Sequence, residues 1–183
     1  LIDRAPGFMD VVCDTGTGIA HTVTHNLTVI PEFYIRKGRT GGGQNWICYH
    51  KDLGATKGIN LNQTGASYTL STVWNNTAPT ASVFTVGTAP AVNSVVNYVT
   101  YLFATLAGVS KVGSYSGTAA LQTIDCGFTT GARFVLIKRT DTTGDWYIWD
   151  SARGIVAGND PYLLLNSTAA EVTSTDYIDP LAP

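Results

Sequence analysis

The stretch "DWYIWDSARG" (Asp145–Gly154) has a counterpart one hundred residues earlier, "NWICYHKDLG" (Asn45–Gly54). Both contain a tryptophan, a second aromatic residue three positions later and a closing glycine. Short runs of aromatic and aliphatic residues of this kind are typical of β-strands. A residue that two copies of a module retain serves the fold of that module, because the flanking loops differ freely. We therefore expect Trp46 and Trp146 to be buried core residues at corresponding places.

The likeness between the two stretches extends over most of the chain. At a shift of 101, "LFATLAGVSKVGSYSGT" (Leu102–Thr118) matches "LIDRAPGFMDVVCDTGT" (Leu1–Thr17), and Phe134 matches Phe33, both expected to be buried. The shift becomes 100 at the tryptophans and 104 after an insertion around "GNDP" (Gly158–Pro161). Matches in this order, with few changes of length, predict a tandem repeat of a module about 100 residues long.

The phase of the repeat predicts three segments. Residues 1–8 correspond to the end of a preceding repeat, residues 9–108 form one complete repeat, and residues 109–183 form a second, truncated repeat. The second copy lacks a counterpart of "SVFTVGTAPAVNSVVNYVTYLFA" (Ser82–Ala104). We therefore expect the chain to be a piece of a longer protein.

The distribution of apolar residues and turn signals favours an all-β fold. Strand-like runs alternate with turns rich in glycine, threonine and asparagine, and no persuasive amphipathic helix is present: the runs are "AHTVTHNL", "EFYIRK", "NWICYH", "SVFTV" and "VVNYVTYLFA". About seven short strands per module predict a β-sandwich or a jelly roll. The segment "YVTYLFA" (Tyr98–Ala104) is apolar on both faces and is predicted to be a central strand.

The composition points to a protein that assembles with other chains. Charged residues make up 13% of the 183 residues, about half the usual share. We therefore expect partner chains to cover much of the surface, as in a homo-oligomer. A net charge of −2 gives no reason to expect nucleic-acid binding. No apolar run reaches the roughly 18 residues that span a bilayer, so no membrane partner is expected either.

The sequence predicts neither an enzyme nor a bound cofactor. The three cysteines lie far apart and form no closely spaced pair of zinc ligands. The three histidines lie in no nucleophile motif. The glycine-rich stretch "TGGGQ" (Thr40–Gln44) lacks the lysine and the helix that phosphate binding requires. We therefore expect no catalytic residue, no cofactor and no metal.

The chain resembles repeat modules in tail and other structural proteins of tailed bacteriophages, notably marine phages, and of prophages. The stretches that carry the resemblance are "RAPGFMDVV", "HNLTVIPEFYIRK", "YLFATLAGVSKVGSYSGT", "CGFTTGARFVLIKRTDTTGDWYIWDSARG" and "NDPYLLLNSTAAEV". It covers nearly the whole chain, and "GARFVLIKR…GDWYIWDSARG" is its most specific part. The resemblance implies tandem jelly-roll or concanavalin-like β-sandwich modules in a virion appendage, commonly assembled as trimers. It implies no catalytic residue and no defined ligand.

Two functions are compatible with these observations. The first is a structural virion protein, a tail-fibre or tail-appendage module that is assembled in the host cytoplasm, contacts other virion proteins and contributes to host attachment. The alternative is a carbohydrate-binding module of a larger secreted protein. The family resemblance favours the first. The genes that flank the parent reading frame would separate the two.

If the module binds a host-surface glycan, the contact should lie where the two copies differ, because the paired strands hold the fold. The candidate ligand-binding residues are Trp149, Asp150, Arg153, Asp145 and Asp160. An aromatic ring beside a guanidinium and a carboxylate can stack on a sugar and bind its hydroxyl groups. The sequence leaves two alternatives open for Trp149. It either packs against a loop or a neighbouring subunit, or it is exposed and able to stack on a sugar.

The carboxylates on either side of the aromatic run suggest a second possibility, a calcium site. Asp141, Asp145 and Asp150 supply carboxylates of the kind that this ion prefers. The first copy has no carboxylates at the corresponding places, and "DTTGD" (Asp141–Asp145) is ordinary hairpin chemistry. We therefore favour a solvated turn.

Overall fold

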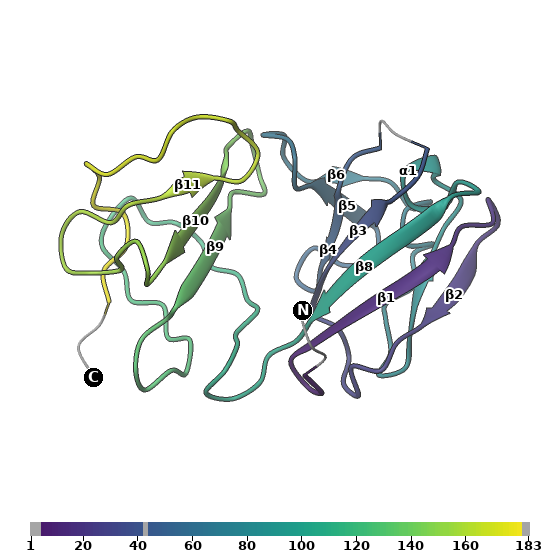
Figure 1. The fold of residues 1–183 in the computed structure, drawn as a ribbon, viewed down its shortest axis with the longest axis horizontal. Coiled ribbons are helices and arrows are strands. Elements are labelled where there is room, and N and C mark those ends of the chain that lie inside the picture. Colours follow the sequence, from purple (N-terminus) through teal and green to yellow (C-terminus); the bar gives the residue numbers. More distant parts are fainter. Residues whose placement is uncertain (1–4, 42–43, 181–183) are drawn as a thin grey trace. The chain divides into compact units, whose positions relative to one another are not determined.

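A computed structural model describes residues 5–41 and 44–180 (Figure 1). Within these residues the chain forms eleven β-strands and one four-residue helix, as expected for an all-β protein. No helix of the described part has the length and apolar character needed to cross a membrane. The elements are β1 (Met9–Thr15), β2 (His21–Thr24), β3 (Phe33–Gly38), β4 (Ile47–His50), β5 (Lys57–Asn60), β6 (Tyr68–Thr69), β7 (Val83–Val86), α1 (Pro90–Asn93), β8 (Asn97–Phe103), β9 (Phe134–Lys138), β10 (Trp146–Asp150) and β11 (Leu163–Leu164).

The chain divides into two compact units. The first comprises Leu1–Asn60 and Ser67–Gly127, and the second comprises Leu61–Ala66 and Phe128–Pro183. The short segment belongs to the second unit because Thr64 O accepts hydrogen bonds from the backbone N–H of a glycine and from a lysine ammonium of that unit, both at 2.9 Å. The repeat limits at residues 8 and 108 describe the period of the sequence and remain predictions.

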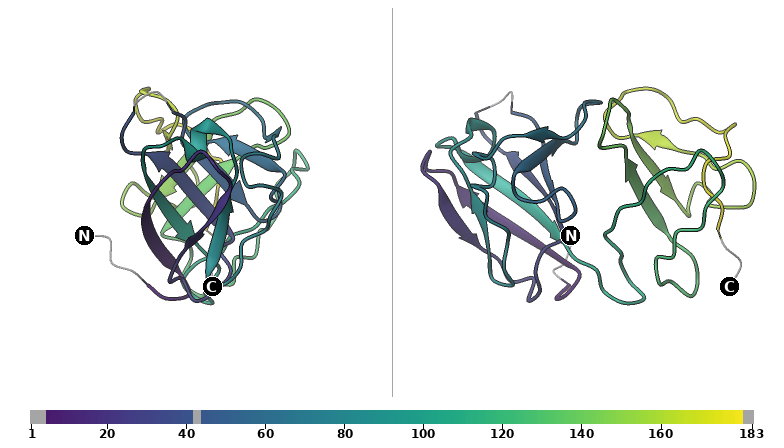
Figure 2. Two further views of the ribbon diagram at one scale, coloured as in Figure 1. Left: turned by 90° about the vertical axis from the view of Figure 1, so that its right-hand side faces the viewer. Right: turned by 180° about the vertical axis from the view of Figure 1, so that it is seen from behind.

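Strand β8 is an interior strand of the six-stranded sheet in the first unit and lies between β1 and β3 (Figures 1 and 2). The sheet has the order β1-β8-β3-β4-β5-β6, with antiparallel pairing throughout. Side chains of Tyr98, Thr100 and Leu102 are completely buried on one face of β8, and those of the alternate residues are half-buried on the other. The prediction of a central strand here is therefore confirmed.

The core of the first unit lies between this sheet and the two-stranded β2–β7 sheet. Val23 of β2 and Phe84 of β7 belong to the same apolar cluster as residues of β3, β4 and β8. At its centre, the rings of Tyr34 and Tyr49 stack with centroids 4.5 Å apart, and the edge of Trp74 meets Tyr34 at 4.9 Å. Two β-layers thus enclose one aromatic core.

A charged side chain, Arg36 of β3, is completely buried in this unit. Its guanidinium forms two parallel hydrogen bonds with the carboxylate of Asp14 in β1, at 2.7 and 2.8 Å. It also donates to Thr100 Oγ1 of β8 (2.9 Å) and to the carbonyl oxygen of Val92 in α1 (2.7 Å). The Tyr98 ring lies 4.1 Å below the guanidinium carbon. One side chain therefore connects four elements.

The second unit contains the antiparallel sheet β11-β10-β9 (Figure 1). Phe134 of β9 lies opposite Asp150 of β10, whereas in the first unit Phe33 of β3 lies opposite His50 of β4. These are the residues that the shifts of 101 and 100 place at the same point. The β3–β4 and β9–β10 pairs therefore share one register.

The strands that pair with the other edge of β4 and of β10 also correspond. Cys48 lies opposite Ile59 in the β4–β5 pair, and Ile148 lies opposite Leu163 in the β10–β11 pair. Ile59 and Leu163 are related by the shift of 104 that the insertion produces. The strands β9, β10 and β11 thus repeat the pairing of β3, β4 and β5.

The expected burial of the two matched aromatic pairs is only partly observed. Trp146 is buried and Trp46 is half-buried. Phe33 is half-buried and stacks on Phe103 of β8 at 6.0 Å, but Phe134 is 59% exposed. The expectation was wrong for Phe134 because β9 is an edge strand. Among the described residues, no strand flanks β9 as β8 flanks β3.

Removing the partner of Arg36 should destabilise the first unit strongly. We expect Asp14→Ala to lower the free energy of unfolding by about 3–5 kcal/mol, because it leaves a buried charge without compensation. Asp52→Ala, which removes an exposed carboxylate 3.9 Å from His50, should cost less than about 1 kcal/mol. Urea unfolding followed by tryptophan fluorescence measures both. A cost below about 1 kcal/mol for Asp14→Ala would contradict the central role of the pair.

Two glycines of the first unit provide a matched test of packing. A Cβ added at Gly87 would lie 2.0 Å from the carbonyl oxygen of Thr72, whereas one added at Gly117 has no heavy atom within 4 Å. We expect Gly87→Ala to lower the unfolding free energy by about 1–3 kcal/mol or more, because a backbone segment has to move. Gly117→Ala should change it by less than about 1 kcal/mol. Equal melting temperatures for the two variants would rule this packing out.

Candidate functional site

Trp149, the aromatic residue proposed to stack on a sugar, lies inside a cluster of rings. Its side chain is 3% exposed. It stacks on Tyr147 with centroids 5.6 Å apart and contacts Tyr162 at 5.9 Å. Tyr162 in turn stacks on Tyr177. This burial favours the packed alternative. The indole Nε1 is buried without a hydrogen-bond partner.

Asp150 and Arg153 lie together in the turn that follows β10. Asp150 Oδ1 accepts hydrogen bonds from the backbone N–H groups of Ala152 and Arg153, both at 3.0 Å, and its other oxygen accepts from the Arg153 guanidinium. The hydrogen bond from the Arg153 N–H is the main reason why the pKa of Asp150 is lowered. Arg153 Nε also lies 2.9 Å from Glu171 Oε1. Asp150 and Arg153 therefore both stabilise the turn, and the Arg153 guanidinium pairs with two carboxylates, those of Asp150 and Glu171.

Asp145 connects the beginning of β10 to the end of β11. Its Oδ1 accepts a hydrogen bond from Asn166 Nδ2 at 2.8 Å, and Asn166 Oδ1 accepts one from the backbone N–H of Trp146 at 2.7 Å. A side chain in this position stabilises the sheet end. Whether Asp145, Asp150, Arg153 or Trp149 also contacts a ligand remains a prediction.

The three carboxylates that were considered for calcium do not come together. Asp141 pairs with Arg139 at 2.7 Å, Asp145 binds an amide, and Asp150 caps a turn. In residues 5–41 and 44–180, the group of acidic and other ligand-type side chains close enough to hold a metal is a different one.

Asp160, the fifth predicted residue, is completely buried. Its Oδ1 accepts a hydrogen bond from the backbone N–H of Val156 at 2.8 Å, and its own N–H donates to the carbonyl oxygen of Thr175 at 2.9 Å. Its second carboxylate oxygen, Oδ2, is buried and has no hydrogen-bond partner. A buried carboxylate oxygen without a donor is costly, because the group has lost its water.

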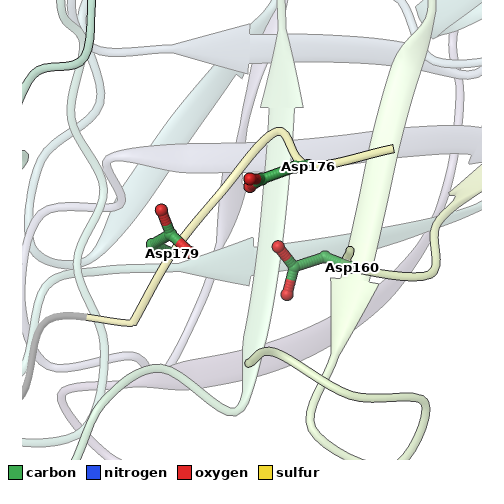
Figure 3. A group of neighbouring side chains, drawn as sticks. All are labelled: Asp160, Asp176 and Asp179. Carbon is green, nitrogen blue, oxygen red and sulfur yellow. The ribbon is translucent and has the colours of Figure 1, made fainter. Parts of the chain in front are cut away.

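Two further aspartates face this buried carboxylate (Figure 3). One oxygen each from Asp160, Asp176 and Asp179 lie within 4.8 Å of one another, and Figure 3 shows the three carboxylates turned toward a common space. The last two are exposed. Asp179 Oδ1 accepts a hydrogen bond from the N–H of Gly158 at 3.2 Å. Sequence analysis missed Asp176 and Asp179, because the group forms only where the C-terminal segment returns to the inserted loop.

A shallow hollow in the second unit offers little chemistry. It has a volume of about 490 Å³ and is lined by Asn62, Leu165, Asn166, Ser167 and Thr168. Its lining contains amides and hydroxyl groups but no carboxylate, imidazole or amine. The side chains that line this hollow therefore do not supply the acid–base pair that general acid–base catalysis requires.

The fold and these side chains define an all-β protein in which most of the predicted site residues cap turns or join strand ends. The family described as "Domain of unknown function (DUF7483)" matches residues 2–182, and the chain belongs to this family. A search of curated proteins and a search of solved structures each found no match.

The turn after β4 should make the first unit sensitive to mild acid. His50 Nδ1 accepts a hydrogen bond from the N–H of Asp52 (3.2 Å), where the second unit uses the carboxylate of Asp150. Burial lowers the pKa of His50 below 6.5, so folding favours the neutral ring. Its contribution to stability is complete above about pH 6.5 and is lost as the pH falls through the folded pKa.

We expect His50→Asn to reduce the loss of unfolding free energy between about pH 6.5 and pH 5, because an amide oxygen can cap the turn without titrating. Urea unfolding of the wild type and the variant across this range measures the two slopes. Parallel profiles would show that His50 does not contribute to the acid sensitivity.

Proposed function

We propose that the chain is a structural virion protein of a tailed bacteriophage, a module of a tail fibre or other tail appendage without enzymatic activity. We further propose that it consists of tandem jelly-roll or concanavalin-like β-sandwich repeats. The observation that carries the proposed repeat is the shared register of β3-β4-β5 and β9-β10-β11. The resemblance of the sequence to phage tail modules supports the biological setting.

A repeated turn supports a module with a period of 101 residues. In Ala5–Met9, the N–H groups of residues 8 and 9 donate to the carbonyl oxygen of residue 5, and in Leu106–Ser110 those of residues 109 and 110 donate to that of residue 106. Both turns contain a glycine in the left-handed region, Gly7 at φ 78° and Gly108 at φ 72°. Glycine adopts this conformation without steric cost.

The open edge of β9 supports assembly with other chains. An edge strand presents unpaired N–H and C=O groups that can pair with a further strand. In the first unit, β8 occupies the corresponding edge of β3 and covers Phe33 with Phe103. Phe134, exposed on β9, is the matching position. We propose that this edge contributes to a homotrimer and to contacts with other virion proteins, in a particle assembled in the host cytoplasm.

The alternative, a carbohydrate-binding module of a larger secreted protein, gains no support from the arrangement of the predicted residues. The candidate stacking ring, Trp149, is buried, and the guanidinium of Arg153 is paired with Asp150 and Glu171. A contribution to host attachment through a surface glycan remains part of the phage proposal, with the turn around Asp150 as the place to test it.

The assembly is tested by sedimentation equilibrium at micromolar concentration. We expect about three times the 19.4 kDa mass of one chain for the wild type and a smaller mass for Phe134→Glu, because a charge on the β9 edge opposes pairing. Ile19→Glu, at a residue of the first unit that is 73% exposed, is the control and should keep the wild-type mass. A monomeric wild type would contradict the assembly, and a trimeric Phe134→Glu would exclude the β9 edge.

A further inference from the structure

We propose that Asp160, Asp176 and Asp179 form a calcium-binding site in the second unit. The three side chains contribute oxygens within 4.8 Å of one another (Figure 3). Acidic residues often gather on protein surfaces without a ligand, and the exposed pair Asp176 and Asp179 alone would mean little. The burial of Asp160 is what distinguishes this group.

The second carboxylate oxygen of Asp160, Oδ2, is separate evidence that the group binds a cation. The residue is completely buried, its Oδ1 is used by the N–H of Val156, and its Oδ2 is buried with no hydrogen-bond partner, while one oxygen of this carboxylate lies within 4.8 Å of oxygens of Asp176 and Asp179. Buried charges in proteins are paired or coordinate metals. Of the ion pairs formed by the described residues, none places a lysine or arginine on any of the three aspartates. A cation supplies the charge that the protein does not.

The ligand set selects the kind of cation. Three carboxylates form a hard, all-oxygen site, which suits Ca²⁺ or Mg²⁺ and lacks the nitrogen or sulfur that zinc prefers. Two ligands lie on exposed, strand-free chain (176 and 179), so the geometry is irregular and leaves room for water. Ca²⁺ accepts six to eight oxygens in variable geometry, whereas Mg²⁺ demands a near-ideal octahedron. The arrangement therefore favours Ca²⁺.

Binding would add a further connection between two segments that backbone hydrogen bonds and a ring stack already join. Asp160 belongs to the segment inserted in the second copy, and Asp176 and Asp179 belong to the C-terminal segment. The hydrogen bonds between Asp160 N–H and Thr175 O, and between Gly158 N–H and Asp179, already bring the loops together. The ion would hold them there.

The test is a titration of the chelator-treated full chain with CaCl₂ by calorimetry. We expect one saturable site per chain, with a dissociation constant of about 10⁻³ M or tighter, and a rise of at least about 4 °C in melting temperature at saturation. Tb³⁺ should show emission sensitised by Tyr177, the neighbour of Asp176, and Ca²⁺ should displace it. Mg²⁺ should bind at least tenfold more weakly.

Two variants and a control decide the assignment. Asp160→Asn and the double variant Asp176→Asn/Asp179→Asn should each weaken calcium binding at least tenfold, and Asp141→Asn, an exposed aspartate of the same unit, should bind as the wild type. The double variant changes only exposed side chains, so it keeps the test valid if Asp160→Asn fails to fold. No saturable heat up to about 10 mM CaCl₂, unchanged binding by the double variant, or equal affinity for Mg²⁺ would overturn the proposal.

Discussion

The guanidinium of Arg36 is completely buried, and the arrangement of the first unit follows from the need to compensate its charge. Two parallel bonds to Asp14 fix β1, one to Thr100 fixes β8, and one to the Val92 carbonyl fixes α1. A buried charge is tolerated only when its donors are satisfied. A displacement of β1 would therefore leave the charge unpaired, and a displacement of β8 or α1 would leave a buried donor without its acceptor.

The second unit keeps the strand pairing but not this chemistry. The residue of β9 that corresponds to Arg36 is Ile137, whereas Tyr115, which corresponds to Asp14 in the sequence repeat, lies in the first unit and is 49% exposed. The strand register is thus retained although the buried ion pair of the first unit has no counterpart at these positions. The turns after β4 and β10 also keep their geometry with different side chains. His50 accepts a hydrogen bond from a following backbone N–H in the first turn, and Asp150 does so in the second. The pairing of the strands is therefore retained in both units although the side chains at these positions differ.

The sequence predicted the elements whose signal is local. The runs that contain β3, β4 and β8 were predicted from their β-branched and aromatic residues, and the place of β8 between two other strands was predicted from its two apolar faces. The pairing of β1 with β8 could not be predicted, because nothing in Met9–Thr15 specifies a partner more than eighty residues away. The exposure of Phe134 was missed for a related reason: burial depends on a neighbouring strand, not on the residue itself.

The candidate site shows the same limit. The proximity of Asp150 and Arg153 is encoded by their spacing, and the structure pairs them. The burial of Trp149 depends on Tyr162, and the surroundings of Asp160 depend on Asp176 and Asp179. Tyr162, Asp176 and Asp179 all follow the aromatic run in the sequence, and the chain turns before it reaches them. Local patterns indicate which side chains can act, but the return path of the chain decides which of them meet.

The long separation between β1 and β8 has a consequence for biosynthesis. Met9 pairs with Phe103 and Thr15 with Asn97. Strand β1 therefore cannot pair with β8 until the ribosome has synthesised the intervening residues. At a synthesis rate of about 5–20 residues per second, this takes on the order of ten seconds. During that interval the nascent chain carries an unpaired strand, and neighbouring nascent chains on one messenger carry the same strand. Folding of this protein is therefore governed by high contact order, and its yield should depend on how quickly translation delivers β8.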